Sequence, residues 1–131
     1  MRAAALAMLV ASCASEPADA PDPCSFHPTV AQGVYGVITY ADDVVGAMPA
    51  ASINVVATPS TGDVAPATVT RQDGFYELEL AVGHYRLCST SGGSDECFAL
   101  DIAPGDLRGI EGVPNGLVGW HWAEAICPTR R

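Results

Sequence analysis

The segment DGFYELELAVGHYRL, residues 73–87, decides the fold class. It begins with the turn dipeptide Asp-Gly, after which apolar residues such as Tyr76 and Leu78 occupy every second position, with glutamates between them. Gly83 allows a second turn, and the alternation resumes with Tyr85 and Leu87. A period of two residues is typical of half-buried antiparallel strands. The segment therefore predicts a β-hairpin with one apolar face.

The rest of the chain repeats this pattern. Five more segments fit the same alternating pattern: GVYGVITY (33–40), ASINVVAT (51–58), ATVTR (67–71), CFALDIA (97–103) and LVGWHWAEAI (117–126). Turn residues separate them, and residues 13–131 contain no convincing helical stretch. The spacing predicts an all-β fold, an antiparallel β-sandwich of about seven strands.

Length and charge limit the classes of function. The 131 residues provide one domain and a tail, and 49% hydrophobic residues are enough for a core. All six basic residues are arginines, and the net charge is −9. A chain of this charge has no basic surface for phosphates, so we expect no nucleic-acid partner. An anionic membrane surface would also repel it, so any membrane attachment has to be hydrophobic or covalent.

The first residues, MRAAALAMLVASC, have the layout of a secretion signal: Arg2, an apolar stretch over 3–11, and small residues before Cys13. Residues 10–13, Val-Ala-Ser-Cys, resemble the lipobox of bacterial lipoproteins. The resemblance implies a signal peptide over residues 1–12 and a lipid on the thiol of Cys13, with fatty acyl chains such as palmitate in the membrane. A frayed N-terminal helix is the alternative interpretation of these residues.

The resemblance also implies a location. The residue after Cys13 is Ala14, whereas lipoproteins retained in the inner membrane commonly have aspartate there. This favours the outer membrane of the cell envelope. Residues 13–32 include ASEPADAPDP (14–23), which has no apolar periodicity, and we expect these residues to form a lipid-anchored tether.

The remaining cysteines suit an oxidising compartment. With Cys13 assigned to lipid, Cys24, Cys88, Cys97 and Cys127 form an even set, which predicts two disulfides. Strand parity turns Cys88 and Cys97 to the same outward face of neighbouring strands, which predicts that they pair and leaves Cys24 for Cys127. No C-x-x-C spacing occurs, so we predict no metal site.

Two longer stretches resemble a known family. GVYGVITYADDVVGAMPAASINVVAT (33–58) is similar to the opening of carboxypeptidase regulatory-like domains, and RQDGFYELELAVGHYRLCST (71–90) resembles their second signature. The resemblance covers about residues 33–103 and fades through APGDLRGIEGVPNG (103–116). It implies a prealbumin-like (transthyretin-type) sandwich over residues 33–127, of a kind that usually accompanies other domains and has no catalysis of its own.

The tetrapeptide GWHW, residues 119–122, is the most unusual in the chain. On a strand, Trp120 and Trp122 share one face and His121 takes the other. If the tryptophans point inward, they cap the core, which the burial of large apolar residues favours. If they point outward, they form a platform for a carbohydrate or a protein partner.

Catalytic motifs are not recognisable in the sequence. His27, His84 and His121 are scattered, and no G-x-S-x-G occurs. We therefore expect a non-catalytic binding or structural module without cofactor or metal, with an envelope protein or glycan as partner. Its contact surface would be loop tips such as residues 41–49 and 89–96, or the exposed sheet. The alternative is an uncharacterised envelope hydrolase or metal-dependent enzyme that uses dispersed histidines and carboxylates.

Overall fold

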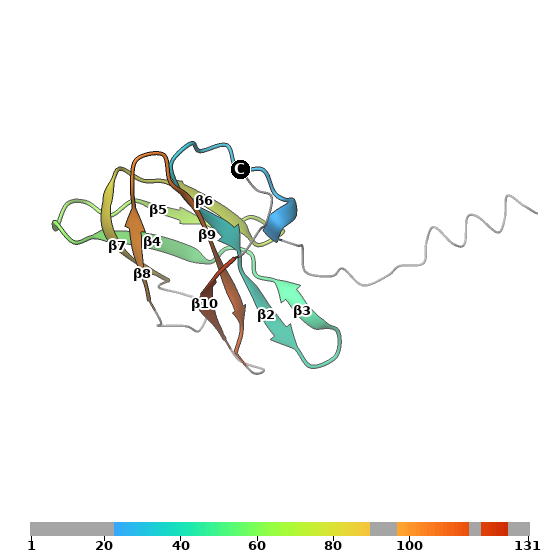
Figure 1. Cartoon of the computed structure of the whole chain (residues 1–131). Coiled ribbons are helices and arrows are strands. Elements are labelled where there is room, and N and C mark those ends of the chain that lie inside the picture. The colour runs from blue at the N-terminus through green and yellow to red at the C-terminus, as the bar shows by residue number, and fades with distance from the viewer. Residues whose placement is uncertain (1–22, 90–96, 116–118, 126–131) are drawn as a thin grey trace, which may run out of the picture.

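Ten strands make up most of the chain that the computed structural model describes, which is residues 23–89, 97–115 and 119–125 (Figure 1). One sheet has the order β10 (Trp120–Glu124), β9 (Leu107–Pro114), β1 (Gly33–Val37), β6 (Phe75–Glu79). The other has the order β5 (Ala67–Val69), β4 (Asn54–Pro59), β7 (Gly83–Cys88), β8 (Phe98–Ile102). A separate hairpin consists of β2 (Thr39–Asp42) and β3 (Gly46–Pro49). The predicted all-β sandwich is confirmed, with more strands than the seven expected.

The two apolar strands of residues 73–87 do not form a hairpin. Strand β6 pairs with β1 in one sheet, and β7 pairs with β4 and β8 in the other. The turn between them therefore crosses from sheet to sheet. Tyr76 and Leu78 face the core from one side, and Tyr85 and Leu87 face it from the other. Alternation shows which side chains are buried but not which strands are paired, so the predicted hairpin was wrong although its inward face was right.

The buried layer lies between the two sheets. It contains side chains from both of them, and most are less than a tenth exposed: Val34, Tyr76, Leu78, Ile110, Trp120 and Trp122 from the first sheet, and Val55, Ala57, Tyr85, Leu87, Leu100 and Ile102 from the second. Phe98 is half-buried and packs against this cluster. The phenolic hydroxyl of Tyr76 donates a hydrogen bond to the carbonyl of Ile110 at 2.5 Å. Burial is the main cause that raises the pKa of Tyr76 well above its usual value, and the negative charge of Glu111 is the second cause.

Strand β9 is the largest departure from the sequence-based expectation. It pairs in parallel with β1, whereas the other strand pairs described are antiparallel. Its sequence, LRGIEGVP, lies in the glycine-rich stretch where no strand was expected. A Cβ on Gly112 would lie 2.8 Å from Cε3 of Trp120 and 3.0 Å from Cγ2 of Ile38. Glycine is required there because the ring and the isoleucine occupy the space of a side chain.

An N-terminal strap, residues 23–32, covers the outer face of the first sheet. After a short 3-10 turn, η1 (Pro23–Ser25), Phe26 stacks on Phe75 with ring centroids 4.5 Å apart. Farther along, the carboxylate of Glu77 accepts hydrogen bonds from the backbone and hydroxyl of Thr29, at 2.7 and 2.8 Å, and from the backbone of Val30 at 3.3 Å. The predicted tether thus includes ten residues that lie against the sheet, and the folded body begins before Gly33.

The strap explains why β1 is buried on both faces. All five residues of β1 are buried. Tyr35 and Val37 form a second apolar cluster with Phe75, and Phe26 packs against this cluster. The first sheet is therefore sandwiched between the core and the strap.

No helix in the described ranges is long and apolar enough to cross a membrane.

Candidate functional site

The two tryptophans considered as a ligand platform are buried. Trp120 is 2% exposed and Trp122 is 6% exposed. Their rings meet edge to face with centroids 4.7 Å apart, and Trp122 meets Tyr76 in the same manner at 6.2 Å. The inward interpretation of GWHW is confirmed. The outward platform is wrong, and the basis for carbohydrate stacking on these rings is lost with it.

The three histidines do not converge on one place. His84 and Asp101 are register partners across β7 and β8, and Nδ1 of the imidazole lies 2.5 Å from Oδ1 of the carboxylate. Both side chains are about three-quarters exposed. Within the ranges that the structure describes, no three histidines, cysteines or acids are grouped closely enough to hold a metal ion. The contact is a cross-strand pair on the surface of the second sheet.

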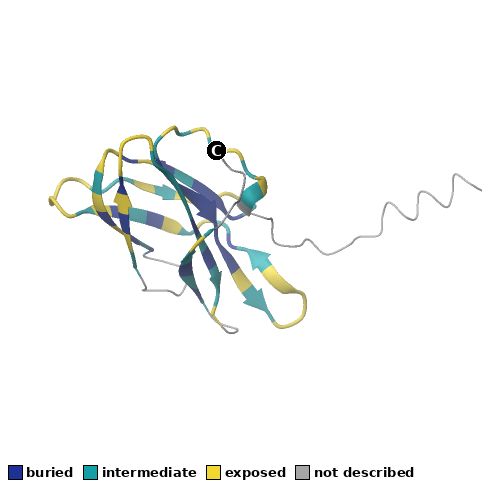
Figure 2. Ribbon diagram, in the orientation of Figure 1, coloured by how far each residue is buried: buried dark blue, intermediate teal, exposed yellow. Residues whose placement is uncertain are grey.

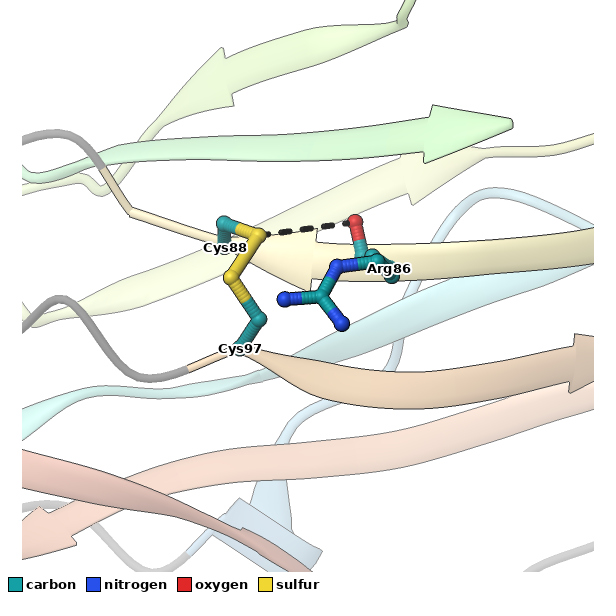
Figure 3. The surroundings of a disulfide bond; sticks show 3 residues. All are labelled: Arg86, Cys88 and Cys97. Atoms are coloured by element: carbon teal, nitrogen blue, oxygen red, sulfur yellow. Dashed lines mark hydrogen bonds between the residues drawn. A yellow bond between two sulfur atoms is a disulfide. The ribbon is translucent and has the colours of Figure 1, made fainter. Parts of the chain in front are cut away.

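The disulfide between Cys88 and Cys97 is confirmed. Their Cα atoms are 4.3 Å apart, close to the ~4.5 Å of directly opposed residues on antiparallel strands. Figure 3 shows the bridge at the ends of the two strands, with the guanidinium of Arg86 turned towards it. The 3.9 Å contact from Sγ of Cys88 to the carbonyl of Arg86 is a packing contact, because a disulfide sulfur has no hydrogen to donate.

The other two cysteine predictions each involve a residue outside the described ranges. Cys24 lies within them and is disulfide-bonded. Cys127, its predicted partner, lies outside the described residues, as do Cys13 and the signal peptide. The pairing of Cys24 with Cys127 and the lipid on Cys13 therefore stay predictions.

The β2–β3 hairpin is the element of the predicted contact surface that the structure describes most fully. It projects from the sandwich beside β9, and its tip is exposed (Figures 1 and 2). Val44 is 85% exposed, Val45 is 44% exposed and Tyr40 is 39% exposed. Most of the second predicted loop, residues 90–96, lies outside the described residues. We therefore treat the hairpin as the candidate site.

The turn at the tip is shaped by an aspartate. Oδ1 of Asp42 accepts hydrogen bonds from the backbone of Val44 at 2.8 Å and of Val45 at 3.1 Å. These two bonds lower the pKa of Asp42, so its carboxylate is charged at neutral pH. An aspartate that binds the backbone two and three residues ahead fixes the turn and holds both valines outward.

The base of the hairpin is joined to the core. Ile38, just before β2, is fully buried and forms a parallel bridge with Gly112 of β9. The hydroxyl of Thr39 donates to the carbonyl of Gly112 at 3.3 Å, and the backbone of Ala50 donates to the carbonyl of Ile38 at 2.8 Å. These contacts join the hairpin to the sandwich, and loops positioned by such a scaffold often carry binding residues.

A shallow groove of about 270 Å³ is formed by the β4–β5 loop and the β6–β7 turn. Its lining includes Val64 and Val82, which are 92% and 56% exposed, together with Asp63 and His84. The hydroxyl of Thr61 donates to Asp63 at 2.9 Å. The groove is open, and its polar groups do not form a ligand cage.

Comparisons with known proteins found no match to a protein family, to a curated protein or to a solved structure.

Sequence reasoning identified residues 41–49 as a contact loop but did not resolve their structure. Residues 39–49 form two paired strands, β2 and β3, with a three-residue turn between them. The sequence GVYGVITY followed by ADDVVG does not show whether this stretch forms two strands or one longer strand. The available signal was the aspartate two residues before Val44, because Asx turns favour such tight reversals.

Proposed function

We propose that this chain is a lipid-anchored protein of the bacterial cell envelope whose β-sandwich serves as a non-catalytic binding or structural module. The anchor is the proposed lipid on Cys13, and the outer membrane is the favoured location. The contact surface is the β2–β3 hairpin. The observation that supports this role most directly is an apolar tip, Val44 and Val45, held outward by a hairpin that is bonded to the core.

Two further features agree with an exported module. The Cys88–Cys97 bridge joins β7 to β8, and disulfides of this kind persist in oxidising compartments. The motifs that resemble carboxypeptidase regulatory-like domains fall on β1–β4 and on β6–β7. We propose a relationship to that family on these motifs and on the sandwich architecture.

The anchor is tested by expressing the full chain in a bacterium with two membranes and supplying a tagged fatty acid. We expect the tag on the wild-type protein and its loss in the Cys13→Ser variant. Separation of the membranes by density should place the tagged protein in the outer-membrane fraction. Untagged wild-type protein recovered from the periplasmic fraction would contradict the proposal.

A further inference from the structure

The sandwich has two distinguishable ends, and the strap runs from one to the other. Phe26, next to η1, stacks on Phe75, which lies opposite Val37 at the last position of β1. Strand β2 begins two residues later, at Thr39. The chain therefore joins the body at the end from which the β2–β3 hairpin projects, as Figure 1 also shows.

The other end of the strap is fixed beside the β6–β7 turn, one side of the groove. Nε2 of Gln32 donates to the carbonyl of Leu80 at 2.8 Å, and the backbone of Gly105 donates to Oε1 of Gln32 at 2.9 Å. The turn that follows Leu80 contains Val82 and leads into the groove with Val64. The exposed valines 44 and 64 thus lie at opposite ends of the molecule.

This polarity matters if the chain is anchored through Cys13, because the anchor precedes η1. Residues 14–22, between Cys13 and the strap, span at most about 28 Å at ~3.1 Å per residue. A tether of this length keeps the hairpin close to the bilayer surface at a high local concentration, so that a weak contact suffices for docking.

We propose that the tip of the β2–β3 hairpin, Val44 and Val45 flanked by Tyr40, rests in the interface of the bilayer to which Cys13 anchors the chain. This inference rests on the proposed function, and it names the lipid surface as the partner of the same site. The valines bury apolar area at the acyl boundary, and tyrosine is favoured at the level of the headgroups. The groove end with Val64 then faces away from the membrane.

The charge of the hairpin selects the kind of lipid. The hydrogen bonds from the turn favour the charged form of Asp42, and Asp43 is exposed beside it. With a net charge of −9, the chain is repelled by anionic headgroups. The partner is accordingly a zwitterionic phospholipid surface, and docking weakens as anionic lipid is added.

The test compares two labelled positions in the full lipidated chain, reconstituted into phosphatidylcholine–phosphatidylethanolamine vesicles. A cysteine replaces either Val44 or Val64, both highly exposed, and receives a polarity-sensitive fluorophore. Vesicles with brominated acyl chains then quench labels that reach the interface. We expect quenching and a blue shift at position 44 and neither at position 64. Addition of phosphatidylglycerol should reduce the signal at position 44.

A second variant measures the contribution of the tip. With the label placed at position 45, Val44→Asp should lower the equilibrium constant for docking about tenfold, since the burial of one valine is lost. Val64→Asp is the matched control and should change nothing. Equal quenching at positions 44 and 64 in acylated protein overturns the inference. The inference is also overturned if envelope proteins shield the label at position 44 and vesicles do not. Absence of acylation at Cys13 overturns the proposed function itself, and tagged fatty acid reports it separately.

Discussion

The contact between Glu77 and the strap makes a stability prediction that depends on pH. Glu77→Gln removes the charge and leaves one acceptor oxygen for the donors of Thr29 and Val30. Hydrogen bonds to charged groups contribute about 1.5–3 kcal/mol and neutral ones about 0.5–1.5 kcal/mol. The contacts to Thr29 are exposed, so values at the low end apply. We expect a loss of about 1–2 kcal/mol in the free energy of unfolding at pH 7.

The sign of the pH dependence follows from the pKa of Glu77. Partial burial alone would raise this pKa, but the hydroxyl and backbone of Thr29, the backbone of Val30 and the charge of Arg71 together lower it below its usual value of 4.5. A lowered pKa means that the stabilisation is complete above that usual value and disappears as the pH falls through the folded-state pKa. The wild type and Glu77→Gln should therefore converge in acid.

Urea unfolding of both proteins, followed by tryptophan fluorescence between pH 7 and pH 3, measures this difference. Glu79→Gln is the matched control, because Glu79 lies two residues along the same strand and its carboxylate has no hydrogen bond or ion pair within the described residues. It should unfold like the wild type throughout. A gap between Glu77→Gln and the wild type that is the same at pH 3 as at pH 7 would show that the carboxylate does not hold the strap.

Three further predictions concern the sandwich. Gly36→Ala places a Cβ 1.9 Å from the carbonyl oxygen of Ile110, a backbone atom that cannot rotate away, so we expect at least ~3 kcal/mol of destabilisation and mostly insoluble protein on expression. Trp120→Phe should lower the free energy of unfolding by less than the ~3–5 kcal/mol of a large core truncation, because the buried indole nitrogen has no hydrogen-bond partner to lose within the described residues. Thermal melts of the wild type and the variant measure the difference. Replacement of Cys88 and Cys97 by serine together should lower the unfolding free energy by about 2–3 kcal/mol in a urea titration, and reductant should then have less effect on the melting temperature than in the wild type.

The alternating pattern predicted the inward side chains well but not the pairing of strands. Tyr76 and Leu87 are buried as expected, and strand parity placed Cys88 beside Cys97. Parity is a local property, so one strand is enough to determine it. Whether two successive strands pair or cross to opposite sheets depends on the angle of the turn between them, which period-two alternation does not specify.

Strand β9 and the strap escaped prediction for a different reason. Glycines such as Gly109 and Gly112 are typical of loops, yet both lie on strand β9. They are suited to this strand because the rings of Tyr35 and Trp120 fill the space where their side chains would be. The strap is short of apolar residues, and Phe26 is paired with Phe75 only through the tertiary fold. Such pairs cannot be found from spacing, because both partners are ordinary residues in distant segments.

The parallel pairing of β1 with β9 has a consequence for how the protein is made. β1 is the first strand of the sandwich and β9 is the ninth, so the middle of the first sheet stays open until β9 has been synthesised. Contacts between such distant segments slow the search for the native state. Until β9 arrives, β1 has an unpaired edge to which another chain can add, so newly synthesised protein has to be kept apart from its neighbours until the last strands are in place.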